Sequence, residues 1–295
     1  MTPRIRPRRS VLYVPGSNAR AMEKARSLPC DCVILDLEDG VAPEMKEAAR
    51  KAVCEAVKAK TYGAREVIVR VNAFETQWSH DDFAAAAEAG PDAVLVPKID
   101  DADEVQLAGA LLAQGGAPLA TFVWAMMETP FAILQARAIV GASGRLAGLV
   151  VGTNDLVKYM GARMVAGREP LLAALSLCVT AARAFGLSAI DGVYNPIGDA
   201  EGFAREARQG RDFGFDGKTV IHPDQIETAN RIFAPDADEV ARARKILAAF
   251  ARPENSGKGA IMVDGHMVEL LHAENARRTL ALAEAIGGYP ALSER

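Results

Sequence analysis

Residues 32–60 read CVILDLEDGVAPEMKEAARKAVCEAVKAK, an apolar run followed by a longer stretch of mixed character. The run at residues 32–37 is rich in β-branched and other apolar side chains, which is typical of a strand buried on both faces of a parallel sheet. Residues 44–60 repeat apolar side chains at helical spacing, which predicts an amphipathic helix. This stretch therefore predicts one strand–helix unit of an α/β fold.

The same unit recurs along most of the chain. Apolar runs are found at residues 11–14, 32–37, 66–71, 93–96, 120–126, 146–151, 188–190 and 217–221. Helix-like stretches alternate with them at residues 18–28, 44–60, 81–89, 101–113, 130–140, 170–185, 199–209 and 223–233. Eight such units are enough to close a (β/α)₈ barrel, and an open doubly wound sheet is the alternative. The count, and the absence of a G-x-G-x-x-G motif after the first run, favour the TIM barrel.

The pattern changes after the eighth unit. A further helix, a polar glycine-containing stretch, a short strand and a last helix are predicted at residues 236–250, 252–259, 260–263 and 268–286. A barrel closes without this segment. We therefore expect residues 1–235 to form a catalytic barrel. Residues 236–295 are expected to form a C-terminal helical extension that serves as a lid and subunit-contact arm.

Composition narrows the class of protein. A net charge of −4 gives no general attraction to nucleic acid or to an anionic membrane. No apolar run reaches the roughly 18 residues of a bilayer span. Residues 1–9 lack the apolar centre of a signal peptide, so we expect a frayed tail there. The cysteines Cys30, Cys32, Cys54 and Cys178 lack metal or redox spacing, which favours buried thiols in a reducing cytoplasm.

Ionisable or strongly polar residues follow nearly every predicted strand. They are Asp36, Glu38, Asp39, Arg70, Asn72, Lys98, Glu128, Asn154, Asp155, Asp191, Lys218 and His222. The active sites of such barrels lie at the C-terminal ends of the strands, so these residues predict a site at the barrel mouth. The alternative is helix capping, which Asn154 and Asp155 would provide for a helix after the sixth strand.

Two of these carboxylates suit a magnesium ion. Glu128 and Asp155 end neighbouring strands, and Mg²⁺ takes one or two protein carboxylates while water and substrate oxygens fill its other positions. The four histidines of the chain show no metal-like spacing, and no cysteine–histidine cluster supports zinc. We therefore expect Mg²⁺, with Mn²⁺ as a substitute, as the cofactor.

Three other strand-end residues have more than one interpretation. Arg70 is a candidate receptor for a carboxylate, or the ion-pair partner of Asp36 or Glu38, and the two roles are compatible. Lys98 fits a salt bridge at the mouth, although a Schiff-base aldolase lysine is conceivable. His222 precedes a proline at a helix start, where a capping role is at least as strongly indicated as catalysis. No serine-hydrolase elbow or P-loop is present.

Several segments together resemble a known family. They are residues 9–16 (RSVLYVPG), 35–41 (LDLEDGV), 70–72 (RVN), 97–98 (PK), 128–129 (ET), 189–194 (AIDGVY) and 217–226 (GKTVIHPDQI). In this order, and over nearly the whole chain, they resemble the citrate lyase β-subunit-like proteins of the HpcH/HpaI aldolase/citrate lyase superfamily. The branch of malyl-CoA, β-methylmalyl-CoA and citramalyl-CoA lyases is the most similar.

The resemblance implies roles for particular residues. It implies that Glu128 and Asp155 bind Mg²⁺ and that Arg70 holds substrate carboxylate or carbonyl oxygens. Catalytic or positioning roles at the mouth are implied for Asp36 and Glu38. Binding of CoA or substrate is implied for Pro15, Gly16, Arg20, Lys24, Gly152 and Thr153.

The resemblance also implies an oligomer. Members of the family are commonly trimers, or dimers of trimers, and the lyase branch carries an aspartate in a C-terminal lid that reaches a neighbouring subunit's site. Here Glu269 takes that position, and its side chain is one methylene longer. We expect Glu269 to act as acid or base from a neighbouring copy.

The predicted activity is therefore a carbon–carbon lyase. It would cleave a 3-hydroxyacyl-CoA of the malyl-CoA or citramalyl-CoA type into an acyl-CoA and an α-keto acid, or form it by Claisen condensation, without nucleic-acid or membrane partners. Three alternatives remain open. These are a thioesterase variant that releases malate, a citrate lyase β subunit that acts on an acyl-carrier protein to give oxaloacetate, and a non-catalytic acyl-CoA binding protein.

Overall fold

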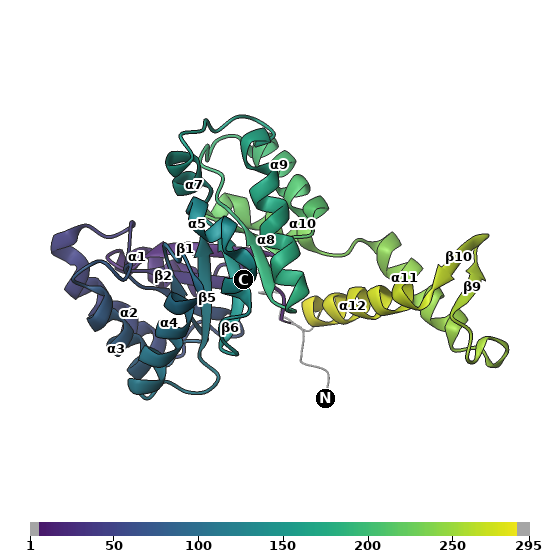
Figure 1. The fold of residues 1–295 in the computed structure, drawn as a ribbon, viewed down its shortest axis with the longest axis horizontal. Helices are drawn as coiled ribbons and strands as arrows, with labels where there is room; N and C mark the ends of the chain where they lie inside the picture. Colours follow the sequence, from purple (N-terminus) through teal and green to yellow (C-terminus); the bar gives the residue numbers. More distant parts are fainter. Residues whose placement is uncertain (1–5, 288–295) are drawn as a thin grey trace. The chain divides into compact units, whose positions relative to one another are not determined.

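The structure, a computed structural model, describes residues 6–287. Eight parallel strands form a closed barrel in chain order, with helices outside them (Figure 1). The strands are β1 (Ser10–Pro15), β2 (Cys32–Asp36), β3 (Glu66–Arg70), β4 (Ala93–Val96), β5 (Phe122–Met127), β6 (Leu146–Val151), β7 (Ser188–Asp191) and β8 (Gly217–Val220). The barrel closes where β1 pairs with β8, with Ser10 opposite Lys218. The predicted TIM barrel is confirmed.

Helices follow the strands at nearly all the predicted places. They are α1 (Ala19–Ala25), α2 (Lys46–Lys58), α3 (Ser79–Ala89), α4 (Ala102–Gln114), α5 (Pro130–Leu134), α6 (Ala136–Val140), α7 (Thr153–Tyr159), α8 (Leu172–Ala184), α9 (Ala200–Phe213) and α10 (Ile226–Phe233). Three 3₁₀ turns precede α2, α8 and α10, namely η1 (Pro43–Met45), η2 (Glu169–Leu171) and η3 (Pro223–Gln225).

Two helical details differ from the sequence prediction. The single helix expected at residues 130–140 is two helices, because Gln135 leaves the helical conformation at ψ 7°. Helix α7 is absent from the predicted set, since its seven residues are too few to show a helical period.

The barrel interior is filled by apolar side chains. The indole of Trp124 on β5 is fully buried at its centre, among residues that include Ile34, Ile68 and Leu95. Gly148 on β6 makes room for it, because a Cβ there would lie 3.1 Å from the indole. Dense packing of this kind makes the barrel a core and not a pore, and it leaves the strand ends to form the site.

The expectation of a frayed tail is wrong for Arg8 and Arg9. The Arg8 guanidinium stacks on the Trp124 ring at 5.1 Å and pairs with Glu66 at 2.6 Å. Arg9 pairs with Asp31 at 2.7 Å. These arginines anchor the chain beside β1, and their partners lie far along the chain, where local sequence does not show the pairing. Residues 1–5 of the expected tail lie outside the described residues.

The described residues divide within α10 into two compact units, residues 8–231 and residues 6–7 with 232–287. The second unit contains α11 (Ala237–Phe250), η4 (Pro253–Asn255), β9 (Ala260–Val263), β10 (His266–Glu269) and α12 (Leu270–Gly287). Its small core joins both helices to the hairpin through Ala243, Ile246, Ile261, Val268, Ala273 and Ala276.

Strand β10 corrects the predicted start of the last helix. Residues 268 and 269 belong to a strand that pairs antiparallel with β9, with His266 opposite Val263. The two-residue turn between them is Asp264-Gly265, and both residues have positive φ. Asp-Gly between two short strands is a strong hairpin signal, so the turn chemistry of the sequence was available to find it.

The four cysteines are buried free thiols, as expected from their spacing. Within residues 6–287, no helix combines the length and the apolar character that a membrane crossing requires.

Candidate active site

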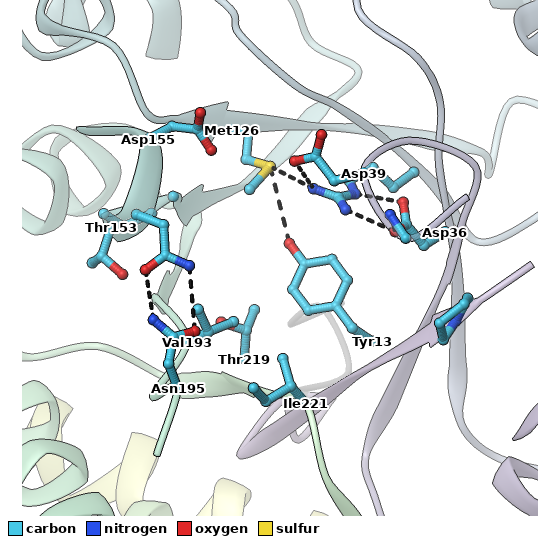
Figure 2. Close-up of a pocket in the computed structure, with 16 residues that line it drawn as sticks. Tyr13, Asp36, Asp39, Met126, Thr153, Asp155, Val193, Asn195, Thr219 and Ile221 are labelled. Carbon is cyan, nitrogen blue, oxygen red and sulfur yellow. Dashed lines mark hydrogen bonds and ion pairs between the residues drawn. The ribbon is translucent and has the colours of Figure 1, made fainter. Parts of the chain in front are cut away.

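A cavity of about 340 Å³ opens where the barrel strands end (Figure 2). Its wall is built from the ends of β1, β2, β3, β5, β6 and β8, and from the loops that follow β2, β6 and β7. The cavity brings together part of the predicted set, namely Pro15, Asp36, Arg70, Gly152, Thr153 and Asp155. Residues predicted from their positions at strand ends therefore line one cavity, which is the candidate site.

Arg70, the last residue of β3, is held by two carboxylates. Its Nε and Nη2 donate to the two oxygens of Asp36 at 2.6 and 2.8 Å, and its Nη1 lies 2.8 Å from Oε2 of Glu38. The ion-pair interpretation of Arg70 is confirmed. Burial raises the pKa of Asp36, but the Arg70 guanidinium and two backbone N–H donors outweigh it and hold that pKa below its usual value. Asp36 is therefore an anion that orients Arg70.

Lys98 links Glu38 to one further carboxylate, that of Glu128. Its Nζ lies 2.6 Å from Oε1 of Glu38, and its backbone N–H donates to Oε1 of Glu128 at 2.8 Å. Burial lowers the pKa of Lys98, but the hydrogen bond to Glu38 and the negative charges of Glu38, Glu128 and Asp39 together outweigh that effect and leave the pKa raised. A Schiff-base lysine must be neutral to attack, so this geometry supports the salt-bridge interpretation.

Glu128 follows β5 and is 1% exposed. Burial, then the charge of Glu38, raises its pKa to about 7, and Asp155 contributes in the same direction. Its carboxylate occupies space that only a glycine leaves free, because a Cβ on Gly152 would lie 2.4 Å from Oε2. Glu128 thus sits behind the cavity wall, close to Asp155.

The pair Glu128 and Asp155 fits a divalent cation. Both offer carboxylate oxygens, the ligands that Mg²⁺ prefers. The pKa of Glu128 is raised first by burial and then by the negative charges of Glu38 and Asp155, and a bound cation would offset that negative charge. Asp155 is directed toward the cavity, which leaves room for water and substrate oxygens (Figure 2). In the described part of the chain no three His, Cys, Asp or Glu residues gather into a metal-binding group.

The capping alternative for Asn154 and Asp155 is wrong. Helix α7 begins at Thr153 with Gly152 at the N-cap, and no side chain caps it. Asn154 instead exchanges two hydrogen bonds with Asn195, at 2.8 and 3.3 Å, and so joins α7 to the loop after β7. Asp155 stands in the first turn, where a helix favours negative charge.

The residues expected to bind CoA lie around β1 and α1. Pro15 lines the cavity, whereas Gly16 is buried outside the cavity lining and donates its N–H to the carbonyl of Asp36 at 2.8 Å. A Cβ on Gly16 would lie 2.6 Å from Val53, so the glycine permits close packing. Arg20 and Lys24 are exposed one turn apart on α1, where two cations are open to an anionic ligand.

Some polar strand-end residues do not reach the cavity. Asp191 and Lys218 are fully buried and pair at 3.1 Å, and Arg168 adds a 2.6 Å ion pair to Asp191. His222 caps η3 by accepting the N–H of Asp224, which confirms its capping interpretation. Glu269 ends β10 in the C-terminal unit, outside the barrel that holds the other candidates.

Sequence reasoning missed Tyr13 and Met126, which both line the cavity. Tyr13 lies two residues before Pro15 on β1, and Met126 two residues before Glu128 at the end of β5. Because side chains alternate along a strand, counting back two positions from each expected site residue would have found them. The missed signal was therefore strand alternation and not residue chemistry.

Comparison with known proteins places this barrel and its mouth in a family. The pattern of the HpcH/HpaI aldolase/citrate lyase family matches residues 9–223, and the chain belongs to that family. It is 48% identical over 285 residues to "(3S)-malyl-CoA thioesterase" of Cereibacter sphaeroides, covering 97% of this chain and 98% of the relative. It is 36% identical over 288 residues to "Citrate lyase subunit beta" of Escherichia coli K12, covering 96% and 95%.

A solved structure is similar to this chain in both fold and sequence. CitE from Mycobacterium tuberculosis, in complex with magnesium, acetoacetate and coenzyme A, matches with a TM-score of 0.74 and 31% identity. The match covers 94% of this chain and 98% of that one. The resemblance noted from the sequence motifs is confirmed.

Proposed function

We propose that this chain is a magnesium-dependent enzyme that acts on the CoA thioester of a short 3-hydroxy acid with a second carboxylate, of the malyl-CoA type. The observation that carries the proposal is one cavity lined by Asp155 and Arg70, with the buried Glu128 carboxylate behind its wall and close to Asp155. Support comes from the (3S)-malyl-CoA thioesterase at 48% identity and from the CitE complex with magnesium and coenzyme A.

Glu128 and Asp155 would hold the metal, which supplies a Lewis acid for a substrate oxygen when it is bound. Side chains of the protein position the other charged residues of the site. Asp36 fixes the Arg70 guanidinium, and Lys98 fixes Glu38 and Glu128. Arg70 then presents positive charge to the acyl part of the substrate, while Arg20 and Lys24 face an anionic carrier such as CoA.

We place thioester hydrolysis first among the candidate reactions. Relatives that match nearly the full length at 48% identity are (3S)-malyl-CoA thioesterases. In this reaction water adds to the thioester carbonyl carbon, the carbon–sulfur bond breaks, and the products are the free hydroxy acid and CoA thiol.

Carbon–carbon cleavage is the second candidate, favoured by the citrate lyase β relative. Loss of the hydroxyl proton would break the bond between the hydroxyl-bearing carbon and the α-carbon of the thioester. An α-keto acid leaves, and the acyl-CoA enolate takes up a proton, for which Glu269 of a neighbouring copy is the proposed donor.

One experiment tests both reactions. Purified protein is incubated with malyl-CoA or citramalyl-CoA, with Mg²⁺ or with EDTA, and all products are identified by mass spectrometry. From malyl-CoA, malate with CoA identifies hydrolysis, whereas glyoxylate with acetyl-CoA identifies cleavage. From citramalyl-CoA the corresponding products are citramalate with CoA for hydrolysis, and pyruvate with acetyl-CoA for cleavage. Metal-dependent formation of either product pair supports the proposal. Turnover of a citryl carrier protein alone, or tight acyl-CoA binding without turnover, would overturn it in favour of a citrate lyase β subunit or a non-catalytic binder.

We propose further that residues 236–295 serve as a lid and subunit-contact arm in a homo-oligomer. Support comes from apolar side chains exposed on this unit, namely Met262, Met267, Leu270 and Leu271. Light scattering of the full chain tests the oligomer. Co-expression of Asp155→Asn with Glu269→Gln tests the lid, because a mixed oligomer regains activity only if Glu269 completes a neighbouring barrel. Mixed protein that stays as inactive as each variant alone would contradict that role.

A further inference from the structure

Two hydrogen-bond donors in the cavity share one poor acceptor. The Tyr13 hydroxyl lies 3.9 Å from the sulfur of Met126, and Nη1 of Arg70 lies 4.0 Å from the same atom (Figure 2). All three residues line the cavity. A thioether sulfur is a weak acceptor, so both donors retain capacity for an oxygen at this place.

The remaining donors of Arg70 are committed elsewhere. Nε and Nη2 grip Asp36, and Nη1 also contacts Glu38, so the edge that carries Nη1 is the one directed to Met126. The Tyr13 ring stacks on the guanidinium with 4.9 Å between the guanidinium carbon and the ring centre. This stacking sets the two donors at a fixed spacing before any ligand arrives.

The charges around Arg70 restrict which kind of ligand oxygen can bind between the Tyr13 hydroxyl and Nη1 of Arg70. Arg70 is already balanced by Asp36 and Glu38, so the donors suit an oxygen that is neutral when it binds and gains charge during reaction. Burial raises the pKa of Tyr13 well above its ordinary value, so the phenol remains a donor and is not a base.

The thioester carbonyl oxygen has this property in both candidate reactions. When water adds to the carbonyl carbon, the π electrons move onto that oxygen, and they return as the carbon–sulfur bond breaks. The proton from water ends on the CoA sulfur. When the carbon–carbon bond breaks instead, its electron pair forms the enolate, which places negative charge on the same oxygen until the α-carbon is protonated. Donors preset at such an oxygen lower the barrier of either reaction.

We propose that the Tyr13 hydroxyl, together with Nη1 of Arg70, binds the thioester carbonyl oxygen of the substrate. The proposal rests on the proposed function for the identity of the substrate. Met126 has a flexible side chain and yields its place to the carbonyl oxygen. Tyr13 is then a catalytic residue of this chain, and its ring and its hydroxyl have separable roles.

Tyr13→Phe tests the hydroxyl, because it keeps the ring over Arg70 and removes only a contact with sulfur. We expect kcat/KM for malyl-CoA to fall about tenfold or more, mainly in kcat, with unchanged thermal stability. Tyr62→Phe is the matched control, since the Tyr62 hydroxyl donates to the carbonyl of Met22 and does not line the cavity. It should retain kcat/KM. Wild-type kcat/KM in Tyr13→Phe would overturn the proposal.

A binding measurement separates this proposal from the proposed function. Acetyl-CoA carries the thioester oxygen and S-ethyl-CoA lacks it, so calorimetry with Mg²⁺ compares their dissociation constants. Wild-type protein should prefer acetyl-CoA several-fold, and Tyr13→Phe should lose that preference while binding S-ethyl-CoA equally well. A preference that survives in Tyr13→Phe, or is absent from wild type, overturns the proposal. Absence of malyl-CoA turnover in wild type would overturn the proposed function. The comparison of acetyl-CoA with S-ethyl-CoA binding would still decide the role of Tyr13.

Discussion

The backbone N–H of Lys98 donates to Oε1 of Glu128 at 2.8 Å, at the point where β4 ends beside β5. Lys98 has a left-handed backbone, with φ of 52°, which is uncommon for a residue other than glycine. Its Nζ pairs with Glu38 at 2.6 Å. One strained residue thus holds two mouth carboxylates, one through its backbone and one through its side chain. Strain of this kind persists where the surrounding structure fixes it, often at functional sites.

Metal affinity should rise with pH. Burial and then Glu38 raise the pKa of Glu128 to about 7, so a proton competes with Mg²⁺ for this carboxylate below that pH. We expect the apparent dissociation constant for Mg²⁺ to be about tenfold weaker at pH 6 than at pH 8. Calorimetric titration at the two pH values measures it, and Glu128→Gln should bind weakly with no such pH dependence. An affinity that is the same at both pH values contradicts the assignment.

Without metal, the same carboxylate should make the fold less stable as pH rises. The pKa of Glu128 is about 7 in the folded chain against an ordinary 4.5, so between these values the folded state holds a proton that the unfolded state has lost. Its contribution to the free energy of unfolding is therefore present below about pH 4.5 and declines up to about pH 7, by roughly 3 kcal/mol in all. Urea denaturation in EDTA at pH 5 and pH 8, for wild type and Glu128→Gln, isolates the effect. Identical pH dependence in the two proteins would show that Glu128 does not cause it.

Gly152→Ala should disable the metal site through sterics. The added Cβ would lie 2.4 Å from Oε2 and 2.5 Å from the Cβ of Glu128, so the Glu128 side chain must move. We expect Mg²⁺ affinity to fall by about 100-fold, the scale on which misplacement by about 1 Å affects a site. Gly144→Ala is the control, because a Cβ there meets no atom within 4 Å. Normal metal binding by Gly152→Ala would show that Glu128 is not a ligand.

The sequence predicted the barrel because its signals are local. Buried strands such as residues 32–37 and 93–96 show as short apolar runs, and each is followed by a helical pattern. Elements without such signals were missed, as α7 shows by its shortness. Strand β10 shows the opposite case, because the Asp264-Gly265 turn was present in the sequence and was not used.

The location of the candidate site could be predicted from the sequence, but the pairing of its charged side chains could not. Placing Asp36, Arg70 and Glu128 at strand ends follows from the fold alone. That Arg70 is shared between Asp36 and Glu38, and that Lys98 holds Glu128 through its backbone, depends on side-chain directions across neighbouring strands. Sequence spacing does not encode those directions. Tyr13 was missed for a different reason, since its position two residues before Pro15 on the same strand was visible in the sequence and was not used.

Replacing Thr153 should lower activity without lowering stability. Its hydroxyl is buried at the cavity wall and has no hydrogen-bond partner among residues 6–287. A buried hydroxyl without a partner weakens a fold, so Thr153→Val should unfold at equal or higher urea concentration, with a gain of up to about 1 kcal/mol. If the hydroxyl binds substrate, kcat/KM for malyl-CoA should fall about tenfold in the same variant. Thr121→Val is the matched control, because the Thr121 hydroxyl is also buried but donates to the carbonyl of Pro91 at 2.8 Å, away from the cavity. It should lose stability and keep its activity. The opposite pattern, a less stable Thr153→Val with full activity, would mean that the threonine hydroxyl supports α7 and does not serve the substrate.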